Sequence, residues 1–392
     1  IGYPGRLSSL YQQFGRAGRK KEPALAVLIA SPSALDQYLM RNPEFLFAGK
    51  GEAAIVNPDN LLIYQDQLKC AAYELRFNEG EKFGSFPVDT FMEHLQNERV
   101  IVAKNGTYFW MSETYPAANV SLRSAATDNF VIVDTTETGN EKVIGEIDYF
   151  SAPLFIHDEA IYMHAGRHYY VDKLRWDERR AEVTLVKSDY YTDAHEKVHR
   201  SILHTDETRE TGALKLHWGE VTLRRQAFLY KKIKIETSEN LGWGQIRTPE
   251  IEMHTQGAWI EIGARALPQI PQNYMSALLT RFAYLLRQLA PLVALCDRRD
   301  ISVSAAYRDV QFGEHAIIFH DNYPGGVGLS HKLVANHEAL FALAAETVAK
   351  CNCATGCPSC IGVWDSNVDG EAEISEDLKT QVRELMDRLF LA

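Results

Sequence analysis

The 392-residue sequence lacks several features that define large functional classes. It has no stretch of about 18 consecutive apolar residues, so no membrane-spanning helix is expected. It has no Gly-x4-Gly-Lys-[Ser/Thr] motif, and therefore no phosphate-binding loop of the usual kind. It also lacks an excess of positive charge, because 41 Lys and Arg residues are outnumbered by 52 Asp and Glu residues, giving a formal net charge of −11. A protein with this balance does not coat nucleic acid by bulk charge.

Cysteine is scarce too, and four of the six cysteines lie within ten residues. This crowding is unlike a secreted disulfide framework, so we expect a reducing, cytoplasmic setting. The spacing C-x-C-x3-C-x2-C is formed by Cys351, Cys353, Cys357 and Cys360. Four thiolates so close together predict one tetrahedral structural metal site, with buried or redox thiols as the alternative. The pattern favours Zn²⁺, and an iron–sulfur cluster stays open as a second possibility.

What the sequence does contain is an ordinary globular composition, with 46% hydrophobic and 24% charged residues. The first 50 residues predict a helix over Leu7–Gly15, a buried strand over Ala24–Ala30 and a helix over Ser33–Met40, which is the order of an α/β unit. The first residue, Ile1, is not an initiator methionine, and we expect the chain to begin inside an element. We therefore expect a fragment or a truncated product.

The remaining sequence predicts a chain of distinct domains. Two helical segments, Leu61–Leu75 and Val88–Asn97, precede two β-prone runs joined by Asn105-Gly106, which is typical of a winged helix. A strand-rich region follows, and then an amphipathic helix over Tyr274–Leu289, a short strand and a further helix that ends near Lys350. The predicted fold class is α+β multidomain, with expected domains at residues 1–50, 51–120, 121–265 and 266–392.

The most informative string near the beginning runs from Gln12 to Arg19 and reads QQFGRAGR. A guanidinium group spreads positive charge over phosphate oxygens, and the glycines permit a close approach of backbone to ligand. Together with Gly2-Tyr3-Pro4-Gly5, the string resembles motif V running into motif VI of superfamily 2 DNA helicases. The resemblance implies that Gln12, Gly15, Arg16 and Arg19 contact ATP, with Arg16 and Arg19 as catalytic arginine fingers. That family usually has a small hydroxyl residue where this chain has Arg6.

The cysteine cluster follows a turn in which Asp321 precedes Pro324-Gly325-Gly326-Val327-Gly328. Turn, helix and cysteines together resemble the C-terminal zinc-binding domain of MrfA/YprA-type DEAD/DEAH-box helicases, and the likeness extends over essentially the whole chain. The resemblance implies the end of a RecA-like α/β lobe, a winged helix, a β-rich connector and an α/β zinc-binding domain.

The same resemblance implies a function. MrfA/YprA-type proteins are bacterial 3′→5′ DNA helicases implicated in DNA repair, which use ATP and Mg²⁺. The expected partner is DNA, single-stranded or a tailed duplex, with a repair nuclease as a possible protein partner and a nucleoid-associated location. Without a phosphate loop, the chain on its own is expected to be inactive.

DNA contacts are predicted at two places. Basic residues are concentrated between Leu214 and Lys234, where Arg224, Arg225, Lys231 and Lys232 are the candidates for phosphate contacts. Trp110, on the predicted wing, is a candidate for stacking on bases. The alternatives are a solvated strand face for the basic residues and ordinary packing for the tryptophan.

Three other functions compete with the helicase interpretation. The string His195-Glu196-Lys197-Val198-His199 matches the H-E-x-x-H pattern of zinc metalloproteases, although its charged residues favour a solvated helix or linker. Asp321 with Glu314, His315 or His320 could form a metal-dependent nuclease site, but an aspartate before such a turn also caps it. A stand-alone zinc-stabilised DNA-binding module without catalysis is the third alternative.

Overall fold

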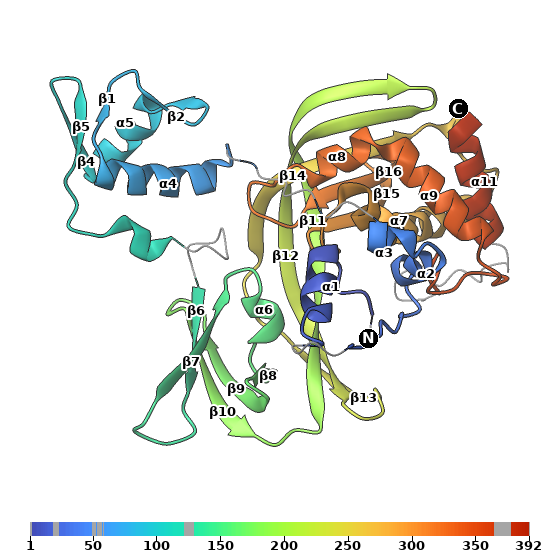
Figure 1. Ribbon diagram of the computed structural model, residues 1–392, viewed down its shortest axis with the longest axis horizontal. Coiled ribbons are helices and arrows are strands. Elements are labelled where there is room, and N and C mark those ends of the chain that lie inside the picture. Colours follow the sequence, from blue (N-terminus) through green and yellow to red (C-terminus); the bar gives the residue numbers. More distant parts are fainter. Residues whose placement is uncertain are drawn as a thin grey trace. The chain divides into compact units, whose positions relative to one another are not determined.

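The computed structural model describes residues 2–18, 23–48, 52, 57, 59–120, 129–363 and 378–391 (Figure 1). The chain is α+β and multidomain, as the sequence predicts. Its contacts divide it into two compact units, the first made of Ile1–Asn57, Ser201–Val221 and His254–Ala392, and the second of Pro58–Arg200 and Thr222–Met253. Among the described helices, none combines the length and the hydropathy that crossing a membrane requires.

The largest sheet has the strand order β11-β12-β14-β16-β15, with β13 paired to β12. In this sheet β14 and β15 both run antiparallel to β16, with Trp259 opposite Ile318 and Val303 opposite Phe319. The second half of β16 is buried from Ala316 to Asp321, which explains its continuous apolar run. The strands are β11 (Tyr190–Thr211), β12 (Leu214–Lys234), β13 (Asn240–Gln245), β14 (Ile251–Ile262), β15 (Ile301–Asp309) and β16 (Gly313–Asp321).

Helices of the first unit gather beside β15 and β16 (Figure 1). They are α7 (Gln272–Ala294), α8 (Leu329–Ala335), α9 (His337–Ala349) and α11 (Leu378–Leu391), with a 3-10 turn η2 at Ala264–Ala266. The apolar stripe of α7, including Phe282, Leu285 and Leu289, is fully buried in one core that also holds Ile317 of β16 and Cys360. The single helix predicted up to Lys350 is two helices, because the backbone breaks between α8 and α9.

The N-terminal segment of the first unit contains α1 (Leu7–Phe14), α2 (Ala34–Arg41) and α3 (Glu44–Ala48). Leu7 and Leu10 pack with Leu39 in a small core that Leu292 of α7 also contacts. Ser33 caps α2 by accepting a hydrogen bond from the Asp36 N–H.

The buried strand predicted over Ala24–Ala30 is wrong. These residues form no strand, and the side chains of Leu25, Val27 and Ile29 are 84%, 68% and 56% exposed. An apolar run becomes a buried strand only when neighbouring strands pair with it, and the described part of the chain brings none to this segment.

The second unit begins with a winged-helix-like group built on α4 (Leu61–Glu74) and α5 (Asp89–Asn97). A three-stranded sheet of order β1-β5-β4 accompanies them, and its hairpin turns at Asn105 and Gly106, both with positive φ, as the sequence predicts. The short elements are β1 (Phe77–Asn78), β2 (Lys82–Phe83), β3 (Phe86–Pro87), β4 (Ile101–Lys104), β5 (Thr107–Trp110) and η1 (Pro116–Asn119). Tyr64, Leu68, Met92 and Leu95 form its core.

A five-stranded sheet of order β7-β6-β10-β9-β8 follows in the second unit. The pair β6 and β10 is parallel and the other pairs are antiparallel. Phe130, Ile132, Val171 and Val183 are fully buried in its core. The elements are β6 (Asn129–Asp134), β7 (Lys142–Asp148), α6 (Ala152–Phe155), β8 (Ile161–His164), β9 (Arg167–Arg175) and β10 (Arg180–Val186).

Candidate metal centre and helix α1

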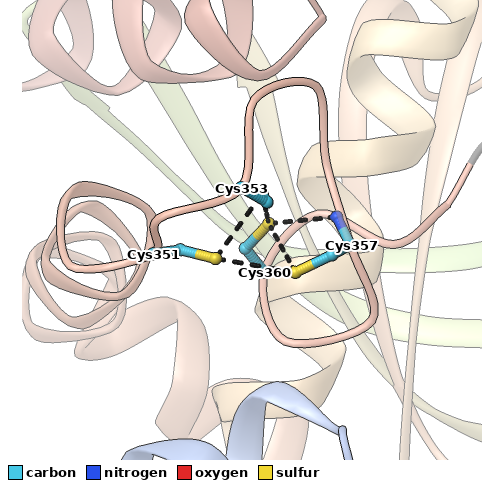
Figure 2. A group of neighbouring side chains, drawn as sticks. All are labelled: Cys351, Cys353, Cys357 and Cys360. Atoms are coloured by element: carbon cyan, nitrogen blue, oxygen red, sulfur yellow. Dashed lines mark hydrogen bonds between the residues drawn. The ribbon is translucent and has the colours of Figure 1, made fainter.

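The four clustered cysteines converge on one point (Figure 2). The Sγ atom of Cys351 lies 3.5 Å from those of Cys353 and Cys357, and the Sγ atom of Cys360 lies 3.5 Å and 3.8 Å from the same two sulfurs. All four sulfurs are within 4.8 Å of one another. A tetrahedral ion with metal–sulfur bonds of ~2.3 Å holds its ligands about 3.8 Å apart. The thiols therefore fit one four-coordinate ion with no open position.

The loop that carries these thiols is closed by its own backbone. The N–H of Cys360 donates to the carbonyl of Cys357 at 3.0 Å, and the N–H of Cys357 donates to the sulfur of Cys360 at 3.4 Å. Gly356 has φ +137°, and a Cβ atom there would lie 2.9 Å from the carbonyl oxygen of Gly362. Lys379 of α11 donates to the carbonyls of Cys351 and Cys353, at 2.6 Å each. Only glycine fits at position 356, and α11 fastens the start of the loop.

The thiols differ in how readily they ionise. Burial opposes ionisation of Cys351, but hydrogen bonds from the Cys353 backbone and from the neighbouring thiols lower its pKa to about 7. Burial raises the pKa of Cys360, which is fully buried. A buried thiolate needs a positive charge beside it, and a soft divalent cation supplies that charge while it accepts the sulfur lone pairs.

Asp321 lies at the end of β16 and is fully buried. Its carboxylate accepts four backbone N–H groups, those of Val327, Gly328 and Leu329 on Oδ2 at 2.7–3.1 Å and that of Ser330 on Oδ1 at 2.7 Å. It thus caps the start of α8. A carboxylate engaged in this way does not bind a catalytic metal, and the described residues show no cluster of Asp321 with Glu314, His315 or His320. The nuclease alternative is overturned.

The predicted nucleotide-contacting residues lie at the end of α1. Gln12, Gly15 and Arg16 are all exposed, so the guanidinium group of Arg16 is accessible to a ligand. The predicted second finger, Arg19, lies outside the described residues. The start of α1 is capped by Glu52, whose carboxylate accepts the N–H groups of Leu7 and Ser8.

The basic residues predicted to contact DNA do not share one face of β12. Neighbouring side chains of a strand point to opposite sides, so Arg224 and Arg225 face apart. Arg225 forms a two-pronged ion pair with Glu196, with distances of 3.0 Å and 2.8 Å. Lys232 lies over the ring of Tyr190 at 5.6 Å, whereas Arg224 is exposed. Of the predicted set, which also includes Lys231, Arg224 keeps the most accessible charge.

The indole ring of Trp110 is packed against neighbouring side chains and is not free to stack on a base. Its indole N–H donates to the carbonyl of Ser112 at 2.7 Å, and the ring meets Tyr73 edge-on at 5.8 Å. Its side chain is partly buried beside the core of the winged-helix-like group.

The H-E-x-x-H string lies on β11 and not on a helix. On a strand, His195 and His199 are about 13 Å apart, too far to hold one metal ion together. Glu196 is occupied by the ion pair with Arg225. The metalloprotease alternative is therefore overturned, and so is the helix or linker predicted for this string.

Sequence reasoning missed one charged cluster in the first unit. Asp297 and Asp300, just after α7, bind the side chain of Arg6, the residue that departs from the helicase motif. The only signals in the sequence were that departure and the mixed charges of Asp297-Arg298-Arg299-Asp300, and they indicate nothing until the fold brings Arg6 to this turn.

Two family models match parts of the chain. Residues 282–361 match the model described as the MrfA Zn-binding domain, a range that holds the second half of α7, β15, β16, α8, α9 and the four cysteines. Residues 56–125 match the model described as the winged helix domain of the ATP-dependent helicase HRQ1. Together with the geometry of the thiols, the first match confirms the predicted structural zinc site.

Longer matches extend over nearly the whole chain. The uncharacterized ATP-dependent helicase YprA of Bacillus subtilis is 42% identical over 373 residues, which cover 95% of this chain and 50% of YprA. A crystal structure of the DUF1998 helicase MrfA bound to DNA superimposes with a TM-score of 0.63 at 40% identity, covering 99% of this chain and 51% of MrfA. A second MrfA structure, bound to DNA and AMPPNP, gives 0.58 at 38% identity and covers 98% of this chain and 49% of that one. The chain thus spans about half the length of these relatives.

Proposed function

We propose that this chain, which is similar to the C-terminal region of MrfA/YprA-type helicases, serves as that region of an ATP-dependent 3′→5′ DNA helicase that acts in DNA repair. The observation that carries the proposal is the pairing of two motifs in one chain. A QQFGRAGR string with an exposed Arg16 lies at one end, and a closed four-thiol site lies at the other.

In this proposal α1 supplies one side of an ATP site. Arg16 and Arg19 stabilise the charge that develops on the transferred phosphoryl group, while Gln12 and Gly15 contact the nucleotide. The opposite side needs a phosphate loop and a Mg²⁺ site, and this sequence has no such loop. The chain alone is therefore proposed to be inactive in ATP hydrolysis.

The other parts of the chain are proposed to guide DNA. Winged helices and basic strands contact phosphates, and Arg224 has the accessible charge for that contact, with Lys231 and Lys232 next in order. Trp110 keeps only a secondary role, because its ring is already packed. A single-stranded or tailed DNA substrate, a repair nuclease as partner and a cytoplasmic, nucleoid-associated location complete the proposal.

Zinc is proposed to act structurally, because four thiols leave no open position for a water or substrate. The chain's own residues hold the loop in register, with Gly356 permitting the turn and Lys379 fixing the carbonyls of Cys351 and Cys353. No chemical step is assigned to the ion.

The test is an ATPase and strand-separation assay on two proteins, this chain alone and this chain joined to a lobe that carries a phosphate loop. We expect DNA-stimulated ATP hydrolysis by the joined protein only. ATP hydrolysis by the chain alone would refute the proposal. DNA binding without hydrolysis by the joined protein would favour the stand-alone zinc-stabilised DNA-binding module instead.

A further inference from the structure

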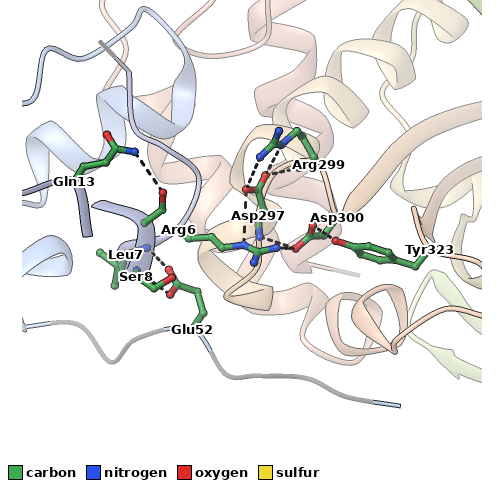
Figure 3. A network of polar contacts seen from close by, with 10 residues as sticks. Arg6, Leu7, Ser8, Gln13, Glu52, Asp297, Arg299, Asp300 and Tyr323 are labelled. Atoms are coloured by element: carbon green, nitrogen blue, oxygen red, sulfur yellow. Dashed lines mark hydrogen bonds and ion pairs between the residues drawn. The ribbon is translucent and has the colours of Figure 1, made fainter. Parts of the chain in front are cut away.

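Arg6 is the residue immediately before α1, and its side chain reaches the turn that follows α7 (Figure 3). Its Nη2 atom lies 2.7 Å from Oδ2 of Asp300, and its Nε atom lies 3.7 Å from Oδ2 of Asp297. The partners are separated by 294 positions in the sequence but belong to the same compact unit. One guanidinium group therefore joins the start of α1 to the turn that follows α7.

The acidic turn is built to receive a cation. The side chains of Asp297 and Asp300 are only 10% and 11% exposed, and the Asp297 N–H donates to Oδ2 of Asp300 at 3.0 Å. Tyr323 donates its hydroxyl proton to the other oxygen of Asp300. Arg299 pairs with Asp297 at 3.3 Å, but its own side chain is 88% exposed. Two nearly buried carboxylates this close together need positive charge, and Arg6 is the less exposed of their two arginines.

Gly5 makes the approach possible. It has φ +87°, and a Cβ atom at this position would lie 3.1 Å from Cγ of Asp297. The backbone at Gly5 thus lies close to the acidic turn, directly before the residue whose side chain binds that turn. The positive φ and the close contact with Asp297 both favour glycine at position 5, independently of the resemblance to the helicase motif.

A helix of eight residues such as α1 is not stable by itself, so its contacts with the rest of the unit determine whether it forms and how its axis is oriented. Its start is held on two sides. Glu52 accepts the N–H groups of Leu7 and Ser8. Burial opposes ionisation of Glu52, but hydrogen bonds from its own backbone, from Leu7 and from Ser8 outweigh burial and lower its pKa. Arg6 is fixed on Asp300. Beyond the start, Leu7 and Leu10 are buried, whereas the end with Gln12 and Arg16 is exposed.

We infer that Arg6 is a positioning residue, which anchors α1 on Asp297 and Asp300 and thereby sets where Arg16 lies relative to the nucleotide. This inference rests on the proposed function. Arg6 does not touch ATP, and it acts through the direction of α1. The acidic turn is the fixed point, because it directly follows the buried helix α7 and is tied to Tyr323.

The first experiment needs no ATP and uses this chain as it stands. Hydrogen exchange of the α1 amides is compared in Arg6→Ala, Arg6→Lys and Arg299→Ala. Arg299→Ala is the matched control, because it removes an arginine from the same carboxylate of Asp297 without touching α1. We expect exchange to be about tenfold faster in Arg6→Ala, intermediate in Arg6→Lys and unchanged in Arg299→Ala. Unchanged exchange in Arg6→Ala would overturn the anchor.

The second experiment measures ATP hydrolysis in this chain joined to a lobe with a phosphate loop. A positioning role predicts that Arg6→Ala lowers kcat about tenfold or more while KM for ATP changes less than threefold, because misplacement costs the transition state more than the ground state. The double variant Arg6→Asp/Asp300→Arg, in which the two charges are swapped, should recover part of kcat because it restores the ion pair.

Two results of that assay separate the inference from the proposed function. If the unaltered joined protein hydrolyses ATP and Arg6→Ala has the same kcat, the positioning role is refuted while the proposed function stands. If the unaltered joined protein does not hydrolyse ATP at all, the proposed function fails and the positioning role fails with it, although the exchange result still reports the anchor.

Discussion

The cysteine loop and helix α1 carry the two most informative motifs of the chain, and they differ in how much of a site each one builds. The four thiols come from ten consecutive residues and meet within 4.8 Å of one another. Gln12 on α1 and Arg16 just after its end are exposed, and the sequence has no phosphate loop to face them. One motif forms a complete site from a single loop, and the other offers one side of a site.

This difference determines which prediction the structure of the chain can test. A closed tetrahedral site can be checked within the chain, because the distances between its sulfurs either fit one ion or do not. An arginine that acts on a bound nucleotide can be checked only against that nucleotide. The zinc site is therefore confirmed, and the finger roles of Arg16 and Arg19 stay predictions.

Removing the metal ion should have the largest effect. Without it, four thiols crowd together in and beside the main core, in which Cys360 is fully buried. We expect a loss of stability on the order of 10 kcal/mol for the zinc-binding domain after chelation or in Cys357→Ser, since metal binding is coupled to folding. Thermal unfolding with and without chelator, together with elemental analysis, measures this loss.

Cys70→Ser is the control for that experiment, because Cys70 lies on α4 and outside the cluster. It should retain one zinc ion per chain and an unchanged midpoint. A colourless protein with one zinc ion excludes an iron–sulfur cluster. A chelated protein that unfolds at the same temperature would show that the thiols are not a structural site and would remove the contrast with α1.

The next largest effect is expected from Arg16→Ala, measured in this chain joined to a lobe with a phosphate loop. Loss of an arginine finger should lower kcat for ATP by about a thousandfold, because the transition-state charge loses its partner. The midpoint of thermal unfolding should not change, since Arg16 is exposed. Gln13→Ala, at an exposed position three residues earlier on α1, should leave both values unchanged. A normal kcat in Arg16→Ala would mean that α1 does not face a nucleotide.

A smaller effect is expected from Asp321→Asn. This variant tests whether the hydrogen bonds within the domain that carries the cysteines stabilise it. The amide of asparagine cannot accept all four N–H groups that the carboxylate accepts, and the position is fully buried. We expect a loss of about 2–3 kcal/mol in the free energy of unfolding, measured with urea. Asp309→Asn, at the partly buried end of β15, should cost less than half of that, because this carboxylate accepts only the N–H groups of Gln311 and Phe312. Equal costs would show that the cap of α8 is unimportant.

The smallest effect is expected at β12. Arg224→Ala should reduce the slope of log K for DNA against log salt by about 1, because one exposed phosphate contact is lost. Arg225→Ala should change the slope less, since Glu196 already balances its charge. Fluorescence anisotropy at several salt concentrations measures both variants. If Arg225→Ala changed the slope more than Arg224→Ala, the phosphate contact would belong to Arg225 and not to Arg224.

The features that could be read from the sequence are those with local causes. Asn105-Gly106 predicted a hairpin because a two-residue turn with positive φ needs these residue types, and the structure has it. The amphipathic helix now seen as α7 and the cap formed by Asp321 were also visible in short stretches. The cysteine spacing predicted a metal site for the same reason, since all its ligands are close in sequence.

The features that could not be read depend on distant partners. The apolar run over Ala24–Ala30 was predicted to be a buried strand, but a strand depends on neighbours that the run itself does not specify. The string from His195 to His199 matched a helical motif but lies on β11, because the pattern of residues does not fix the secondary structure around it. The bond between Arg6 and Asp300 spans 294 positions, beyond the reach of any local pattern.

That long separation also affects how the protein is made. A ribosome releases the chain from its N-terminus at roughly 5–20 residues per second, so α1 emerges about 15 to 60 s before Asp300 does. During this interval Leu7 and Leu10 lack Leu292 of their small core, and Arg6 lacks its acidic anchor. The entropy cost of closing a loop grows only slowly with its length, so the long separation affects the time of assembly more than the stability. Helix α1 is therefore synthesised well before the residues that hold it in place.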